Sequence, residues 1–249
     1  MKRLFYILVC LIGSIVFGQN EELFKQGNAF YNDGNYEQAI EKYEAIIASG
    51  AHSAELYYNL GNAHYKLNHI APSIYYYEKA LQLKPNDNEI NNNIAFARNM
   101  TIDAVDAIPE VGFSKFINNL SKSLTFEKWG FLSISFVILF VILFLAYYFA
   151  DSSTRKRIAF IGSMGCLVVA CFALFFAFHN YDLVEKDKPA IVFAEETQVK
   201  SEPNLRSTES FKLHEGTKVQ VLDTVNNWKK IKLADGKIGW IPTSDIKLL

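Results

Sequence analysis

Side chains that could perform catalysis are few and scattered in this sequence of 249 residues. The five histidines show neither the H-x-x-x-H nor the H-E-x-x-H spacing that places two metal ligands on one helical face. They are His52, His64, His69, His179 and His214. The sequence also lacks a G-x-S-x-G nucleophile motif and a glycine-rich phosphate loop after a strand. We therefore expect no catalytic residue, no metal site and no cofactor, and predict that the chain is not an enzyme.

Thiol chemistry and paired carboxylates are equally poorly supported. The three cysteines, Cys10, Cys166 and Cys171, all lie in apolar segments, so we expect no disulfide and no thiolate metal site in a water-facing domain. Glu195 and Glu196 are adjacent in a predicted strand, where successive side chains point to opposite faces. Two carboxylates in this arrangement would not share an acid–base task.

The N-terminal part of the chain repeats itself at a fixed spacing of 34 residues. The recurring pairs are Gly27 and Gly61, Asn28 and Asn62, Ala39 and Ser73, and Tyr43 and Tyr77. At these positions the segment resembles the tetratricopeptide repeat, a pair of antiparallel helices with this period. The resemblance implies an all-α domain over residues 19–103, with repeats at about 20–53 and 54–87 and a capping helix at 88–103.

The periodicity of apolar residues agrees with this helical interpretation. One predicted helical face carries Leu23, Gly27 and Phe30, and the next carries Ala39, Tyr43 and Ile46. We expect Asn35 and Asn68 to act as helix N-caps, because asparagine is favoured at that position.

The resemblance also implies that one face of the first helix in each repeat lines a concave groove. The matching positions follow the motif Glu-x2-aromatic-x3-Asn-x2-Tyr and are Glu21, Phe24, Asn28, Tyr31, Glu55, Tyr58, Asn62 and Tyr65, with Glu89 on the capping helix. Asparagine amides could hold a peptide backbone through donor and acceptor together, and the aromatic rings offer flat apolar contact. Because these positions carry no lysine or arginine, a free C-terminal carboxylate is a poor candidate ligand. The alternative is that this face is an ordinary solvated helix surface.

Two apolar runs without a charged residue, 129–150 and 158–178, occupy the middle of the chain. A helix of this length rises about 1.5 Å per residue and covers the roughly 30 Å hydrocarbon core of a bilayer. The connecting loop 151–157 contains Arg155, Lys156 and Arg157, and short basic loops stay in the cytoplasm. We therefore predict two spans of the inner membrane, with both large domains on the periplasmic side. The alternative, a buried hairpin of a soluble protein, would need a shell of other elements around it.

Residues 1–18 are typical of a secretory signal peptide, with Lys2 and Arg3 before an apolar centre. An uncleaved N-terminal anchor is the alternative. Between the repeats and the first span, residues 104–128 contain apolar residues at helical spacing, which predicts an amphipathic linker helix in the membrane surface. The alternative is a linker helix packed on the repeats. A short linker, 179–188, follows the second span.

The C-terminal segment 189–249 is predicted to be all-β. The expected strands are 191–193, 198–200, 218–223, 228–233 and 237–241, separated by turn sequences. Five short strands suit a small closed barrel, and the run from Trp228 through Asp235-Gly236 to Gly239-Trp240 resembles the bacterial SH3-like domain. Trp228 and Trp240 are the candidate binding surface of this domain, although such residues also serve as packing residues in a small barrel.

Taken together, the sequence predicts a multidomain membrane protein with tetratricopeptide repeats, two transmembrane helices and an SH3-like barrel. This order resembles the BatE-type family of the Bacteroidetes aerotolerance (Bat) operon. The resemblance implies a non-enzymatic adaptor that works beside von Willebrand-type Bat membrane proteins and a MoxR-type ATPase. An alternative is a sensor or anchor that binds peptidoglycan peptide through the SH3-like domain. Nucleic acid is disfavoured, because residues 19–106 carry twelve acidic against six basic side chains.

Overall fold

The computed structural model describes residues 19–105 and 112–249. The predicted signal peptide and residues 106–111 of the predicted linker lie outside the described residues. The chain forms two compact units: one combines the segment up to residue 107 with residues 188–249, and the other contains residues 108–187. The chain thus leaves the first unit once and returns to it.

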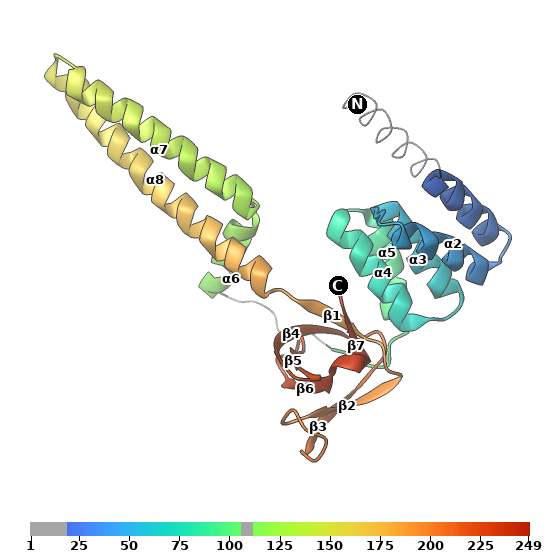
Figure 1. The fold of residues 1–249 in the computed structure, drawn as a ribbon. Helices are drawn as coiled ribbons and strands as arrows, with labels where there is room; N and C mark the ends of the chain where they lie inside the picture. Colours follow the sequence, from blue (N-terminus) through green and yellow to red (C-terminus); the bar gives the residue numbers. More distant parts are fainter. Residues whose placement is uncertain (1–18, 106–111) are drawn as a thin grey trace, which may run out of the picture. The chain divides into compact units, whose positions relative to one another are not determined.

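Five helices form the N-terminal part of the first unit (Figure 1). They are the helix at 19–32, α2 (Tyr36–Ala48), α3 (Ala54–Lys66), α4 (Ile70–Leu83) and α5 (Asn88–Arg98). Both α2 and α4, and likewise α3 and α5, begin 34 residues apart. The helices therefore follow the period found in the sequence.

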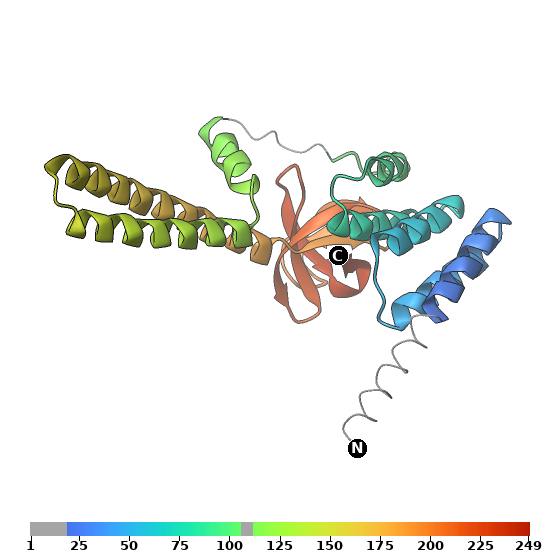
Figure 2. The same ribbon diagram turned by 90° about the horizontal axis from the view of Figure 1, so that it is seen from above.

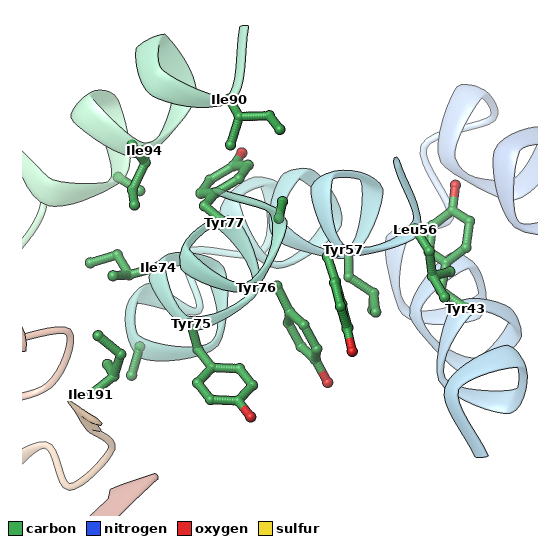
Figure 3. Close-up of a cluster of buried hydrophobic side chains, with 14 of the residues drawn as sticks. Tyr43, Leu56, Tyr57, Ile74, Tyr75, Tyr76, Tyr77, Ile90, Ile94 and Ile191 are labelled. Atoms are coloured by element: carbon green, nitrogen blue, oxygen red, sulfur yellow. The ribbon is translucent and has the colours of Figure 1, made fainter. Parts of the chain in front are cut away.

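Glycine and tyrosine recur with this period because they pack against each other within each repeat. A Cβ atom on Gly27 would lie 2.5 Å from Cε1 of Tyr43, and one on Gly61 would lie 2.6 Å from Cδ1 of Tyr77. Each tyrosine ring thus packs directly on the backbone of the preceding helix, which only glycine permits. Tyr43 and Tyr77 are buried to about 1% exposure and belong to one continuous core (Figure 3).

Only some of the repeat helices have an N-terminus capped by a side chain. Ser53 accepts a hydrogen bond from Leu56 N, and Asp87 accepts from Glu89 N and Ile90 N. Asn35 occupies an N-cap position without a side-chain bond. The N-cap prediction for Asn68 was wrong, because this residue adopts a left-handed conformation with φ of 58° and α4 begins after His69. Asparagine tolerates that conformation better than most residues.

The helix α5 caps the array but is shorter than predicted. It ends at Arg98, and segment 99–105 contains no helix. Ile90 and Ile94 project from α5 toward Ile74 and Tyr77 of α4 (Figure 3). The opposite face is exposed and, apart from Phe96, mostly polar, with residues such as Asn92. A polar outer face is what a terminal helix of a repeat array requires.

The C-terminal part of the first unit is a seven-stranded antiparallel sheet (Figure 1, Figure 2). Its strands are β1 (Pro189–Val192), β2 (Glu196–Lys200), β3 (Glu209–His214), β4 (Lys218–Val225), β5 (Trp228–Lys232), β6 (Ile238–Pro242) and β7 (Ile246–Leu248). The order is β3-β2-β6-β5-β4-β1-β7. Sequence reasoning missed β3 and β7. These two strands are the edges of the sheet, and no pairing joins them. The sheet is therefore open, whereas the sequence predicted a closed barrel.

Inward-facing residues of this sheet form their own apolar core. Val199, Ile231 and Ile241 are completely buried, and Gly239 allows the close approach of β6 to Val199. The alternation of buried and exposed residues along β4 and β6 matches the period of a sheet with one buried face.

The second unit is a helical hairpin preceded by a short helix. Its elements are α6 (Gly112–Lys122), α7 (Phe126–Phe149) and α8 (Ser153–Lys186). Small residues of α8, including Cys166 and Ala170, are buried against α7, and Ser133 donates a hydrogen bond to the carbonyl oxygen of Ala170. Small side chains at such a contact let two apolar helices approach closely.

Both hairpin helices are long and apolar enough to cross a membrane. In their most apolar windows only 6% of the α7 residues and 22% of the α8 residues are buried. No shell of protein therefore covers these windows among the described residues, unlike the core hairpin of a soluble protein. α6 belongs to this unit: Ser121 donates to Asn180 Oδ1 of α8 at 2.6 Å, and its carbonyl oxygen accepts from Trp129 Nε1 of α7 at 2.9 Å.

Candidate peptide-binding groove

The first helices of the successive repeats present two neighbouring pockets that share Tyr58. One pocket of about 260 Å³ is lined by Tyr31, Tyr58, Asn62, Tyr65, Lys66, Tyr77, Asn93 and Phe96. The other, of about 330 Å³, is lined by Ala54, Glu55, Tyr58, Asn59, Lys84, Asp87, Glu89 and Ile90. The fold thus brings six of the nine predicted groove residues into these two pockets. The remaining three, Glu21, Phe24 and Asn28, line neither of them.

Asn28 forms a polar link between the first and second repeats. Its Oδ1 atom accepts from the hydroxyl of Tyr43 at 2.7 Å and from Nδ2 of Asn59 at 3.0 Å. Tyr43 belongs to the helix that packs on Gly27, and Asn59 belongs to the first helix of the next repeat. One carbonyl oxygen therefore joins three helices.

The same arrangement recurs 34 residues later. Asn62 Oδ1 accepts from the hydroxyl of Tyr77 at 2.6 Å and from Nδ2 of Asn93 at 2.9 Å. Asn93 Nδ2 also donates to the hydroxyl of Tyr58 at 2.9 Å. Sequence reasoning missed Asn59 and Asn93, although they too lie 34 residues apart. Their shared spacing was the signal that could have found them.

These hydrogen bonds correct the expected role of the two predicted asparagines. A carbonyl oxygen has two lone pairs, and both are used inside the repeat array at Asn28 and Asn62. Their Nδ2 groups form no hydrogen bond within residues 19–105 or 112–249. Each amide can therefore offer a ligand donors, but not the acceptor that was also expected.

The hydroxyls of Tyr43 and Tyr77 stay protonated at neutral pH. Burial raises the pKa of Tyr43 to about 12 and raises that of Tyr77 further. Rings of the groove face pack on these tyrosines: Phe24 lies 5.8 Å from Tyr43 and Tyr58 lies 6.0 Å from Tyr77, between ring centroids. The aromatic groove face is consequently supported from beneath by a fixed second layer.

The pockets contain lysine side chains, whereas the motif positions carried over from the repeat family contain none. Lys66 lines the first pocket, and Lys84 lines the second beside Glu55 and Glu89. These lysines fall outside the positions carried over from the repeat motif, so the sequence comparison did not include them. Glu21 forms an exposed ion pair with Lys25 on its own helix at 2.8 Å. Its hydrogen bond with Lys25 holds the pKa of Glu21 below its usual value.

The two tryptophans of the sheet lie outside its apolar core. Trp228 and Trp240 are half-buried, and the core consists of other residues. Trp228 pairs with Pro242 and Trp240 pairs with Lys230 across β5 and β6, so all four share the face opposite Ile231 and Ile241. The Lys230 ammonium lies 5.9 Å from the centre of the Trp240 ring. Both tryptophans are therefore available as surface residues.

The histidines do not form a metal centre in the described part of the chain, where no group of three ligand-type side chains comes together. His64 is buried in the repeat core, and its ring stacks on Tyr76 with 5.4 Å between ring centroids. Burial, helped by the neighbouring His69 and Lys247, lowers the pKa of His64 to about 4. Its ring is therefore neutral at physiological pH.

Comparison with known families identifies both parts of the first unit. Residues 24–88 match the family model of the tetratricopeptide repeat, and residues 195–247 match that of the bacterial SH3 domain. No match is found among curated proteins. Both families typically serve as binding modules rather than catalytic domains. The chain thus combines a tetratricopeptide repeat region with a bacterial SH3 domain.

Proposed function

We propose that this protein is a non-enzymatic, membrane-anchored adaptor whose repeat groove holds an extended segment of a partner protein. The observation that carries the proposal is the pair of pockets around Tyr58, in which aromatic faces lie beside amide donors and lysine side chains. A peptide in extended conformation presents carbonyl oxygens to such donors and side chains to such rings.

The anchor in this proposal is the hairpin of α7 and α8, which spans the inner membrane twice. Its exposed apolar surface supports insertion into lipid, since water would make that surface costly. The basic residues between the two apolar runs, Arg155, Lys156 and Arg157 in the first turns of α8, favour a cytoplasmic position for this end of the hairpin. Both the repeats and the SH3 domain then lie in the periplasm, after an N-terminal signal peptide at residues 1–18.

The partners that we propose are membrane proteins of a Bat-type aerotolerance or stress complex. The support is the order of the segments, which resembles the BatE-type family: repeats, two apolar helices and a C-terminal SH3 domain. The groove would then receive a periplasmic segment of a neighbouring membrane protein. Crosslinking in native membranes followed by mass spectrometry would identify that neighbour.

The groove itself is tested by truncating side chains that line it and are not fully buried. Tyr65→Ala and Phe96→Ala remove half-buried and exposed rings from the first pocket. We expect each to reduce recovery of crosslinked partners about tenfold or more, as loss of an aromatic anchor does. The matched control is Leu205→Ala, which removes an exposed apolar side chain from the SH3 domain. Equal recovery with all three variants would refute groove binding.

A second candidate function is binding of peptidoglycan peptide by the SH3 domain. The observation that favours it is the outer face of β5 and β6, where Trp228, Trp240 and Lys230 remain partly exposed. Purified full-length protein in detergent should then sediment with sacculi, and Trp240→Ala should reduce the pelleted amount. If the protein stays in the supernatant, this second function is excluded.

A further inference from the structure

A buried carboxylate at the end of the repeat array draws its cations from two domains. Glu78 of α4 is 6% exposed. Its Oε1 atom accepts from Arg98 of α5 at 2.6 Å, and its Oε2 atom accepts from Lys218 of β4 at 2.8 Å. A charge removed from water is costly unless its hydrogen-bonding capacity is met. Without the SH3 domain, half of this carboxylate would lose its partner.

A second carboxylate on the repeat side also accepts hydrogen bonds from the SH3 domain. Asp103 follows α5 and accepts three hydrogen bonds from the end of β3 and the turn after it: from His214 N at 2.7 Å, His214 Nδ1 at 2.8 Å and Thr217 Oγ1 at 2.6 Å. Burial raises the pKa of Asp103, but these hydrogen bonds outweigh it and lower the pKa. Asp103 therefore fixes the segment after α5 to the SH3 domain.

Apolar residues of the SH3 domain complete the core of the repeats. Ile191 of β1 is completely buried and belongs to the cluster that includes Ile74 and Tyr75 (Figure 3). Phe193 packs edge-on against Tyr75, with 5.7 Å between ring centroids. A Cβ atom on Gly216 would lie 2.9 Å from the Ile74 side chain, so the turn approaches α4 as closely as glycine allows.

The last strand adds a cation held by aromatic rings. The Lys247 ammonium lies 4.5 Å from the centre of the Tyr75 ring and 5.6 Å from that of Phe193. Rings at this range attract a cation through their quadrupole. The contact thus combines a buried carboxylate whose partners come from both domains, apolar packing and cation–π attraction.

We propose that the end surface of the repeat array, formed by α4 and segment 99–105, is a binding site for the chain's own SH3 domain. The SH3 domain occupies this site permanently and acts as an intramolecular partner. The repeats and the SH3 domain then work as one binding platform, and the SH3 domain is not a module that moves freely on a tether. This inference goes beyond the proposed adaptor function, because it holds whatever ligand enters the groove.

The test is to cut the chain between the two partners and ask whether they stay together. A protease site is inserted between residues 107 and 108, and the full-length protein is purified in detergent, cleaved and analysed by size exclusion at micromolar concentration. We expect the repeat fragment to co-elute with the fragment that carries the hairpin and the SH3 domain. Separation of the wild-type fragments would overturn the proposal.

Charge-reversed variants identify the contact. Lys218→Glu places a second carboxylate beside Glu78, and we expect it to weaken association of the cleaved fragments about 100-fold. The side chain of Lys218 is 45% exposed, so the SH3 fold should tolerate the change. Lys247→Glu should also weaken association. The matched control is Lys232→Glu, an exposed reversal on β5 that should leave co-elution unchanged. If Lys218→Glu fragments co-elute like the control, the proposed site is wrong.

The same preparation shows whether the SH3 domain docks on the repeats of its own chain or on those of a second copy. Copies with different affinity tags are expressed together, and one tag is captured before and after cleavage. Recovery of a single tag supports docking within the chain, whereas recovery of both shows that a second copy supplies the SH3 domain and contradicts the proposal. Neither result depends on a groove ligand, so failure here leaves the crosslinking test of the adaptor function intact.

Discussion

At the scale of single residues, the asparagines of the repeat motif are structural before they are functional. Asn62 satisfies the buried hydroxyl of Tyr77 and also receives Asn93 from the following helix. A side chain that contacts a ligand only at its surface could be removed without unfolding the array. Asn62 is not of this kind, because its removal takes the acceptor from the Tyr77 hydroxyl and leaves Asn93 Nδ2 with only the Tyr58 hydroxyl.

Asn62→Ala should therefore destabilise the repeats by about 1–3 kcal/mol, the cost of leaving a buried polar group unpaired. Tyr77→Phe removes the donor instead and should cost less, since Asn62 keeps its bond from Asn93. Thermal unfolding of the purified protein, followed by circular dichroism, compares the two variants. If Asn62→Ala melts at the wild-type temperature, the network does not stabilise the fold.

The buried imidazole of His64 predicts a dependence of stability on pH. Its pKa is about 4 in the fold, against 6.5 for an unperturbed histidine. The unfolded chain then binds the proton more readily than the folded chain. The contribution of His64 to the free energy of unfolding is therefore fully present above pH 6.5 and decreases as the pH falls toward 4. The loss attributable to this residue should reach about 3 kcal/mol at most.

The groups around His64 are His69, Tyr76 and Lys247, none of which is a carboxylate that could favour the charged imidazole. Chemical denaturation at pH 7 and pH 4.5 should show a smaller decrease for His64→Gln than for the wild type. His52→Gln, at an exposed position, serves as the control and should retain the wild-type decrease. Equal decreases in all three proteins would contradict the assignment.

At the scale of elements, the sequence predicted what depends on periodicity and missed what depends on distant contacts. The 34-residue spacing predicted the helix pairs, because glycine at 27 and 61 and tyrosine at 43 and 77 meet within each pair. The end of α5 at Arg98 could not be predicted in this way, because segment 99–105 is fixed by Asp103 to residues more than 100 positions away. The strand β3 was missed for a similar reason: its sequence Glu-Ser-Phe-Lys-Leu-His has Leu213 as its one buried residue, and the strand pairs with β2.

The groove, too, was predicted from the sequence only in part. The motif positions identified the aromatic face, but Lys66 and Lys84 enter the pockets from positions that the motif does not contain. Whether a lysine on a solvated helix reaches a pocket depends on the packing of the next helix. Local spacing does not encode that packing.

Gly61→Ala tests the close packing of α3 on α4. Alanine is favoured over glycine in a helix interior by about 1 kcal/mol, yet its Cβ would lie 2.6 Å from the Tyr77 ring. We expect the overlap to prevail and the melting temperature to decrease, because overpacking a core costs about 1–3 kcal/mol. In a Tyr77→Leu background the ring is absent, and the same change should cost less or even stabilise. Additive effects of the two substitutions would argue against direct contact.

At the scale of the whole molecule, the docked domains constrain how the chain can cross a membrane. Residues up to 107 and residues 188–249 form one compact unit. A chain that leaves this unit, crosses a bilayer and returns must cross an even number of times. The two apolar helices meet this requirement, while the basic loop between them bears on which side the unit lies.

Labelling of single cysteines tests separately whether the two domains lie on the same side of the membrane and which side that is. Cys10, Cys166 and Cys171 are first replaced by serine or alanine, and Glu21→Cys, Leu205→Cys and Ser153→Cys are made one at a time in that background. We expect a membrane-impermeant maleimide added to spheroplasts to label positions 21 and 205 equally, and position 153 only after lysis. Labelling of 21 and 205 from opposite sides would contradict the docked unit itself. If both are protected and position 153 is labelled, the unit is intact but faces the cytoplasm, so the basic loop does not control orientation here and the proposed periplasmic partners would be excluded.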